Sequence, residues 1–471
     1  MKIASSRGQM AGSPPNLHTM YSRSVCIHDV LKVKDRVSAN MFFKLKKLQQ
    51  QQIVNKVNLA VRRCKTKGKR FKARELLQDD ACENLVRLYE GYRIFRTLRN
   101  SPSYLEKRKK DLMAMIRQLG CPTWFVSLSA ADTRWTDLLQ ILGRLVDKKE
   151  YTDQELKDMD WESRTRLVRA DPVTCARFFD NRLQLFLNHV LKSDLHPIGR
   201  IKDSFVRIEF QQRGSPHAHI MFWIHDAPKV DHSSPEEVTV FIDQHVSCSS
   251  KVDEEAASLF ELQQHRHSKT CRKKQKAICR FGFPKPPMAR TFVLEPLSSA
   301  ENQEAKVNYQ KVEKILSEHK DGIDMSYQEF LNTLELTEEK YIDAVRTSIN
   351  RKTVFLQRQP QQIRVNPYMK HLLPIYGANH DIQFITDPFA CAMYIVAYMS
   401  KSQTGMSVLM DRVCKEAREA SSDIRKQVRD MGKAFMNSVE VGAQEAAYLI
   451  LQLPVTRASR SVINNFAYYQ K

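Results

Sequence analysis

The sequence predicts an α+β protein, because short segments with a two-residue period lie among long segments with a helical period. Residues 206–212 and 216–223 both alternate, and Arg213-Gly214-Ser215-Pro216 at their junction supplies turn residues, so we expect a β-hairpin. Residues 122–129 have the aromatic and aliphatic composition of a buried strand. Helical periods cover residues 41–119, 171–191 and 387–401.

Composition limits the functional class. The chain has 471 residues, enough for two or three domains, and 42% of them are hydrophobic, as in globular proteins. No apolar run approaches membrane-spanning length, and the first twenty residues lack the apolar segment of a secretory signal. A formal charge of +22 favours a polyanionic partner, with nucleic acid ahead of a membrane surface. Ten cysteines without a signal peptide indicate thiols that are free or metal-bound.

The N-terminal third is basic. Residues 1–38 show no sustained period, and we interpret them as a partly ordered leader. Eight basic residues fall within residues 62–74 of the helical stretch. Such a run is typical of an arm that binds the DNA backbone or of a nuclear import signal, and a solvated linker explains it equally well. We expect a nuclear protein.

Two histidines define the first candidate site. His217 and His219 are two residues apart on a strand, so they share one face and can bind one divalent cation. If Gln211 pairs with His217, Glu209 pairs with His219, and the apolar residues of both strands share the other face. A one-residue slip would put Phe210 beside His219 and mix the faces. Glu209 and Gln211 are therefore the candidates for the third ligand.

A second candidate site lies in a segment rich in cysteine and histidine. Its residues fall within 32 positions and have the donor types of tetrahedral structural zinc, although their spacing is not that of a standard finger. Free thiols and surface histidines on a basic loop are the alternative. We expect three thiolates and one of the two imidazoles to hold the ion, with the basic residues between them facing a DNA backbone. The candidates are Cys248, His265, His267, Cys271 and Cys279.

The helical stretch 387–401 carries a polar stripe. Tyr394 and Tyr398 are four residues apart and Lys401 follows three residues later, so all three share one face. Tyrosines at this spacing are common in helix cores. Two phenols and an ammonium opposite an apolar face would, however, be an unusual core.

These motifs together resemble the Helitron helicase-like N-terminal domain, the nuclease part of rolling-circle transposases. That family belongs to the endonucleases with a His-hydrophobic-His motif. Four blocks carry the resemblance, in family order, over roughly residues 100–460, with a fifth stretch at residues 379–384. The four blocks are Trp124–Ser129 with Trp135, Glu209–His219, Cys279–Pro284, and Tyr394-x3-Tyr398-x2-Lys401.

The resemblance implies a central antiparallel sheet that carries the two histidines, flanked by helices, with the tyrosine helix facing the metal. It implies Mg²⁺ or Mn²⁺ on His217, His219 and either Glu209 or Gln211, where the ion would polarise a phosphodiester. The substrate would be single-stranded DNA at transposon ends and targets.

The resemblance also implies the chemistry. Tyr394 or Tyr398 would attack phosphorus and leave a 5′-phosphotyrosine and a free 3′-hydroxyl, while Lys401 offsets negative charge. Two tyrosines would permit a second cleavage while the first strand end is held. The family continues into a helicase, but this sequence has no Gly-x4-Gly-Lys-Ser/Thr phosphate loop. We therefore expect no ATPase activity here, and a helicase supplied in trans or by a longer version of the chain.

Two other functions are compatible with the sequence. One is a non-catalytic DNA-binding remnant of such a transposase, and the other is a zinc-stabilised nucleic-acid-binding module. The predicted organisation is a leader (1–38), a basic helical region (39–118), an endonuclease core in two parts (119–235 and 361–471), a Cys/His-rich insertion (236–290) and a helical insertion (291–360).

Overall fold

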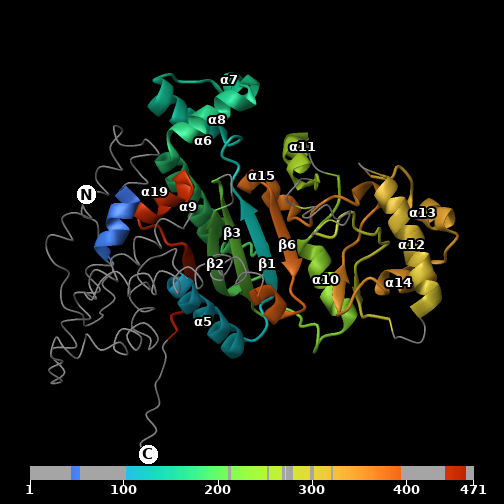
Figure 1. Cartoon of the computed structure of the whole chain (residues 1–471). Coiled ribbons are helices and arrows are strands. Elements are labelled where there is room, and N and C mark those ends of the chain that lie inside the picture. Colours follow the sequence, from blue (N-terminus) through green and yellow to red (C-terminus); the bar gives the residue numbers. More distant parts are fainter. Residues whose placement is uncertain are drawn as a thin grey trace, which may run out of the picture.

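A computed structural model of the chain describes residues 44–52, 102–210, 214–251, 254–267, 271, 279, 281–297, 302–319, 322–393 and 441–462 (Figure 1). At its centre is a five-stranded antiparallel sheet with the order β6-β1-β3-β2-β7. The predicted α+β class, with an antiparallel sheet that carries the two histidines, is confirmed. The strands are β1 (Trp124–Ser129), β2 (Ile201–Phe210), β3 (Pro216–Ile224), β6 (His380–Phe384) and β7 (Thr456–Ala458).

One face of the sheet forms the main hydrophobic core together with the helices that cover it. Apolar side chains alternate along the central strands, as their two-residue period requires, and pack on helices α6 (Thr136–Leu142) and α9 (Pro172–Leu185). Helix α9 begins where the sequence predicts, because the Asp171 side chain accepts a hydrogen bond from the Thr174 amide and Pro172 occupies the first turn. The buried strand residues are Trp124, Val126, Leu128, Val206, Ile208, Ala218, Ile220 and Phe222.

The opposite face has two unlike halves. Phe125, Phe205, Met221 and Trp223 form its apolar half and are covered by helix α5 (Pro102–Leu119). The Trp223 indole donates a hydrogen bond to the Gly120 carbonyl at 2.9 Å, which fixes the end of α5 against the sheet. The other half is polar and carries His217 and His219.

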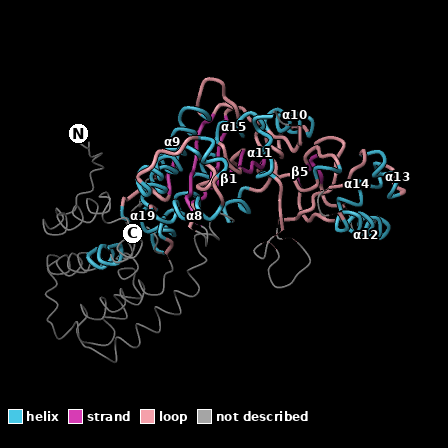
Figure 2. Tube along the Cα trace, turned by 90° about the horizontal axis from the view of Figure 1, so that it is seen from above, coloured by secondary structure: helices cyan, strands magenta, loops and turns pink. Residues whose placement is uncertain are grey.

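The chain between β3 and β6 builds a second lobe. Its helices α12 (Asn302–Glu318), α13 (Tyr327–Leu334) and α14 (Glu338–Arg346) form a core of their own around Tyr341 and Phe330. Strands β4 (Phe292–Leu294) and β5 (Thr353–Phe355) pair at its base. Figure 2 shows this lobe at the far end of the molecule from α9 and α19 (Ala443–Ile450).

The remaining helices frame the sheet. Helices α7 and α8 pack against α6 at one end, α10 contacts β4, and α11 packs against α15 (Figure 1). None of the described helices is long and apolar enough to cross a membrane. These helices are α7 (Asp153–Asp158), α8 (Trp161–Ala170), α10 (Pro235–His245), α11 (Glu254–Phe260) and α15 (Leu373–Tyr376).

Candidate active site and metal centre

The hairpin β2–β3 brings the two histidines next to an acidic residue. Glu209 pairs with His217, and Arg207 pairs with His219. The predicted register, with Gln211 opposite His217, is wrong by two residues. Strand β2 ends at Phe210, which pairs with Pro216. A shift of two residues preserves the faces, and the polar residues of both strands still share one face.

Hydrogen bonds hold both imidazoles in place. The Nε2 atom of His219 lies 3.1 Å from a carboxylate oxygen of Glu209, its diagonal neighbour across the hairpin. The Nδ1 atom of His217 lies 3.0 Å from the hydroxyl oxygen of Ser129 on β1. The ring of Phe125 stacks on His219, with centroids 5.8 Å apart. Neighbouring strands therefore orient each ring.

A polar row crosses the whole sheet at His219. Strand pairing places Asp381 of β6, Ser127 of β1, His219, Arg207 of β2 and Thr456 of β7 side by side on the same face. The row explains why sequence reasoning missed some site residues, because β6 and β7 join the sheet from distant parts of the chain. In the sequence, Asp381 is indicated only by its place in the stretch at residues 379–384, which is part of the resemblance to the Helitron family.

Burial sets the charge of this face. Burial, together with the neighbouring His219, lowers the pKa of His217 to about 4, so this imidazole is neutral at pH 7 and can ligate a metal. Burial raises the pKa of Asp381 to about 6, although a hydrogen bond from Gln383 opposes this shift. Burial also raises the pKa of Glu445, near the start of α19, to about 7, although the positive charge of Arg207 opposes this shift.

The donor set at the sheet fits a hard divalent cation. Neutral imidazole nitrogens and a carboxylate oxygen are acceptable ligands for Mn²⁺, and Mg²⁺ takes the carboxylate with water. Glu209 is the third-ligand candidate that the structure places beside a histidine. Gln211, Tyr394, Tyr398 and Lys401 lie outside the described residues.

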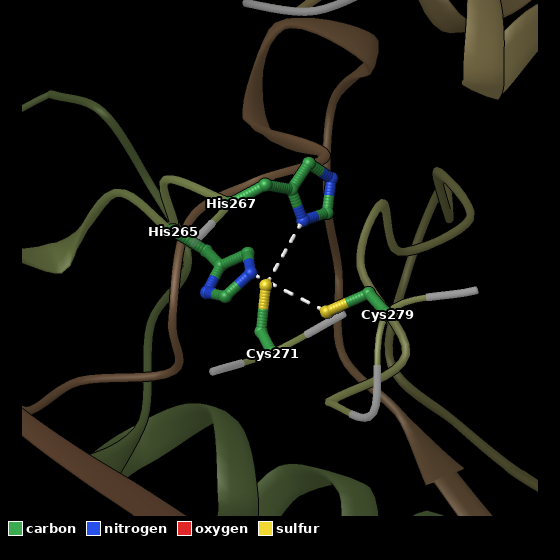
Figure 3. A group of neighbouring side chains, drawn as sticks. All are labelled: His265, His267, Cys271 and Cys279. Carbon is green, nitrogen blue, oxygen red and sulfur yellow. Dashed lines mark hydrogen bonds between the residues drawn. The ribbon is translucent and has the colours of Figure 1, made fainter. Parts of the chain in front are cut away.

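A tighter group of donors lies in the Cys/His segment (Figure 3). Within the described residues, the group whose ligand atoms all lie within 4.8 Å of one another is here and not at the sheet. Both thiols are buried, and the ring of Phe283 stacks on His265 with centroids 4.5 Å apart. The group consists of His265, His267, Cys271 and Cys279.

Two pairs of these donors have a spacing close to that of a tetrahedral zinc site. Zinc–sulfur and zinc–nitrogen bonds of about 2.3 and 2.05 Å, at the tetrahedral angle, put the sulfur and nitrogen atoms about 3.6 Å apart. The observed distances are 3.5 Å between Cys271 Sγ and His267 Nδ1, and 3.3 Å between Cys279 Sγ and His265 Nε2. The four residues therefore fit zinc, and all four tetrahedral positions are supplied by protein.

The structure places Cys248 outside this group, contrary to our expectation of three thiolates and one imidazole. Its sulfur accepts a hydrogen bond from the buried guanidinium of Arg358 at 3.0 Å. Burial raises the pKa of the Cys248 thiol, and Arg358 opposes this shift. The backbone next to Cys248 explains its place, because Ser247 exchanges two hydrogen bonds with Tyr368.

Comparison with known families gives the context of the sheet. The family model of the Helitron helicase-like domain at the N-terminus matches residues 21–222. Our recognition of this family is confirmed over those residues. The Helitron-like segment includes β1, β2 and β3 up to Phe222, and thus Glu209 and both histidines. No curated protein matches the chain.

The Cys/His group lies beyond the Helitron-like segment but is tied to its sheet. The His265 amide donates to the Arg364 carbonyl at 2.7 Å, and the Lys285 amide donates to the Ile363 carbonyl at 2.8 Å. A few residues on, the Ile382 amide of β6 donates to the Pro367 carbonyl at 3.2 Å. Residues 363–367 thus connect the Cys/His group to β6, the edge strand that carries Asp381.

Proposed function

We propose that the chain is a metal-dependent single-strand DNA endonuclease and strand transferase of the Helitron type, which works through a 5′-phosphotyrosine intermediate. The observation that carries the proposal is the convergence of His217, His219 and Glu209 on the polar half of the sheet face, within the segment that matches the family. The high positive charge of the chain supports a DNA substrate.

The residues of the site have distinct tasks in this proposal. His217, His219 and Glu209 would hold Mg²⁺ or Mn²⁺, which supplies Lewis-acid polarisation of the scissile phosphodiester. Ser129 keeps His217 oriented, and Glu209 keeps His219 oriented.

Tyr394 or Tyr398 is proposed as the nucleophile. Its phenolic oxygen forms a bond to phosphorus as the bond from phosphorus to the 3′-oxygen breaks, and the proton lost by the phenol is matched by one gained at the 3′-oxygen. Lys401 would stabilise the negative charge on the phosphate. The phosphotyrosine bond conserves the energy of the phosphodiester, which permits rejoining to another strand.

We further propose that His265, His267, Cys271 and Cys279 hold a structural zinc ion. A closed set of four protein ligands leaves no position for a substrate oxygen, so this ion would not take part in cleavage. We place the protein in the nucleus, on the basic run at residues 62–74. A helicase in trans or in a longer chain would supply the single strand.

Cleavage of a labelled single-stranded oligonucleotide by the full chain tests the catalytic proposal. We expect nicking in Mn²⁺, none in EDTA, and none with His217→Ala. His225→Ala is the matched control, because His225 is exposed at the end of the same hairpin and should leave nicking unchanged. Nicking by His217→Ala at the wild-type rate would overturn the proposal, and DNA binding without nicking by the wild-type chain would favour the non-catalytic remnant.

A further inference from the structure

A small cavity opens between α5 and the edge strand β7. It has a volume of about 150 Å³, enough for a phosphate group and its water. Thr456, which ends the polar row through His219 and Arg207, is one of its lining residues. The other lining residues are Lys107, Arg108, Asp111, Phe205, Ala458, Arg460, Ser461 and Val462.

Two arginines in the lining are held by carboxylates. Arg108 donates one hydrogen bond to Asp111 at 3.1 Å, and Arg460 donates one to Asp203 at 2.8 Å. A guanidinium has five N–H donors in a fixed fork, so each arginine keeps donors for a ligand. Such an arrangement fixes the guanidinium before the ligand arrives and lowers the ordering cost of binding.

Unpaired buried atoms also indicate a ligand at this cavity. Within the described residues, the Nε atom of Arg108 and the hydroxyl of Thr456 are buried and make no hydrogen bond. Buried polar atoms are rarely left without a partner, and both a guanidinium N–H and a hydroxyl can donate to an anionic oxygen. Lys107, which is exposed at the rim, adds positive charge that no described carboxylate pairs.

We propose that this cavity binds a backbone phosphate of single-stranded DNA, on the β7 side of the cleavage site. The inference rests on the proposed function, because it takes the substrate of that site and extends its path along the polar row. Adjacent strands are about 4.8 Å apart, so Thr456, two strands away, lies roughly 10 Å from His219 across the sheet. The half-buried Arg207 between them offers the DNA strand a further cation.

The test measures binding of the full chain to a fluorescent oligothymidylate by anisotropy, over a range of salt concentrations. Lys107→Gln and Arg460→Gln should each weaken binding about fivefold at low salt and reduce the slope of log K against log salt by about 0.7. Thr456→Val, which nearly conserves side-chain volume, should weaken binding without changing the slope. Lys110→Gln is the control, because Lys110 is exposed on α5 but does not line the cavity.

Each outcome decides the proposal. Loss of affinity and slope in the two cation variants, with Lys110→Gln unchanged, supports it. Wild-type binding by the cavity variants overturns it, and so does an equal loss in Lys110→Gln, which would indicate a diffuse basic surface. Nicking in Mn²⁺ is scored separately on the same samples. If the wild-type chain nicks DNA and the cavity variants bind DNA as the wild type does, only the cavity proposal fails. If the cavity variants bind DNA more weakly but the wild-type chain does not nick it, only the proposed catalysis fails.

Discussion

Removing one donor from the Cys/His group should release its metal. In Cys279→Ser, a buried thiol whose sulfur lies 3.3 Å from His265 Nε2 is replaced by a hydroxyl, a poor zinc ligand. Three donors remain, and we expect zinc affinity to fall by at least about a hundredfold, or about 2.7 kcal/mol. Metal present at a hundred times its Kd contributes a similar amount to stability, so the variant should melt about 5–10 °C lower.

Two measurements on the same samples test this expectation. Elemental analysis of the purified chain should find about one zinc per wild-type protein and almost none in Cys279→Ser. Thermal melting should show the lower transition in the variant, and a zinc chelator should lower the transition of the wild-type chain to the same temperature. The loss is expected to reach β6 as well, because residues 363–367 link the group to that strand.

Cys248→Ser is the control that separates the observed group from the predicted one. Cys248 is buried but bonded to Arg358, so its replacement should leave zinc content at the wild-type level. Retention of zinc by Cys279→Ser, or loss of zinc from Cys248→Ser, would contradict this assignment of the ligands. Absence of zinc from the wild-type protein would favour the alternative of free thiols and metal-free histidines.

Two further predictions follow from the sheet. Glu209→Ala should raise the Mn²⁺ concentration needed for nicking about tenfold or more, because Glu209 lies 3.1 Å from His219. Gln211→Ala should raise it much less. If a metal titration shows the reverse order, Gln211 is the ligand. Burial lowers the pKa of His380 to about 4, below its unfolded value of about 6.5. Between these pH values the unfolded chain therefore binds more protons than the folded chain. The free energy of unfolding should fall as the pH drops through this window, by up to about 3 kcal/mol. Urea unfolding at pH 7 and pH 4.5 should show this loss in the wild-type chain and a smaller one in His380→Gln, while the exposed control His371→Gln should behave as wild type.

The periodicity of the sequence predicted the faces of the hairpin but could not decide its register. An alternating pattern looks the same after a shift of two residues, so Glu209 opposite His217 satisfies it as well as Gln211 does.

The site residues from distant strands could not be predicted from local pattern. Asp381 shares a row with His219 because β6 pairs with β1, and that pairing joins residues about 250 positions apart in the chain. Arg207 is a polar residue in an alternating strand, and nothing in its spacing separates it from an ordinary surface arginine.

The Cys/His group shows a similar limit. Its donor types and short spacings predicted a metal site, and two histidines and two cysteines do converge. Cys248 is also a cysteine close in the sequence. The backbone hydrogen bonds between its neighbour Ser247 and Tyr368 place it beside Arg358 instead. Ligand choice therefore depended on how the segment folds over residues 363–368.

The most direct test of the central claim is a covalent trap on a denaturing gel. The full chain is incubated with Mn²⁺ and a single-stranded oligonucleotide that is labelled at its 3′ end or at its 5′ end. A 5′-phosphotyrosine keeps the downstream fragment on the protein, so the 3′ label should move with the protein band, and the 5′ label should appear in a shorter free oligonucleotide. The double variant Tyr394→Phe/Tyr398→Phe and samples in EDTA should give no adduct. An adduct that persists in either, or its absence from the wild-type chain, would contradict the account.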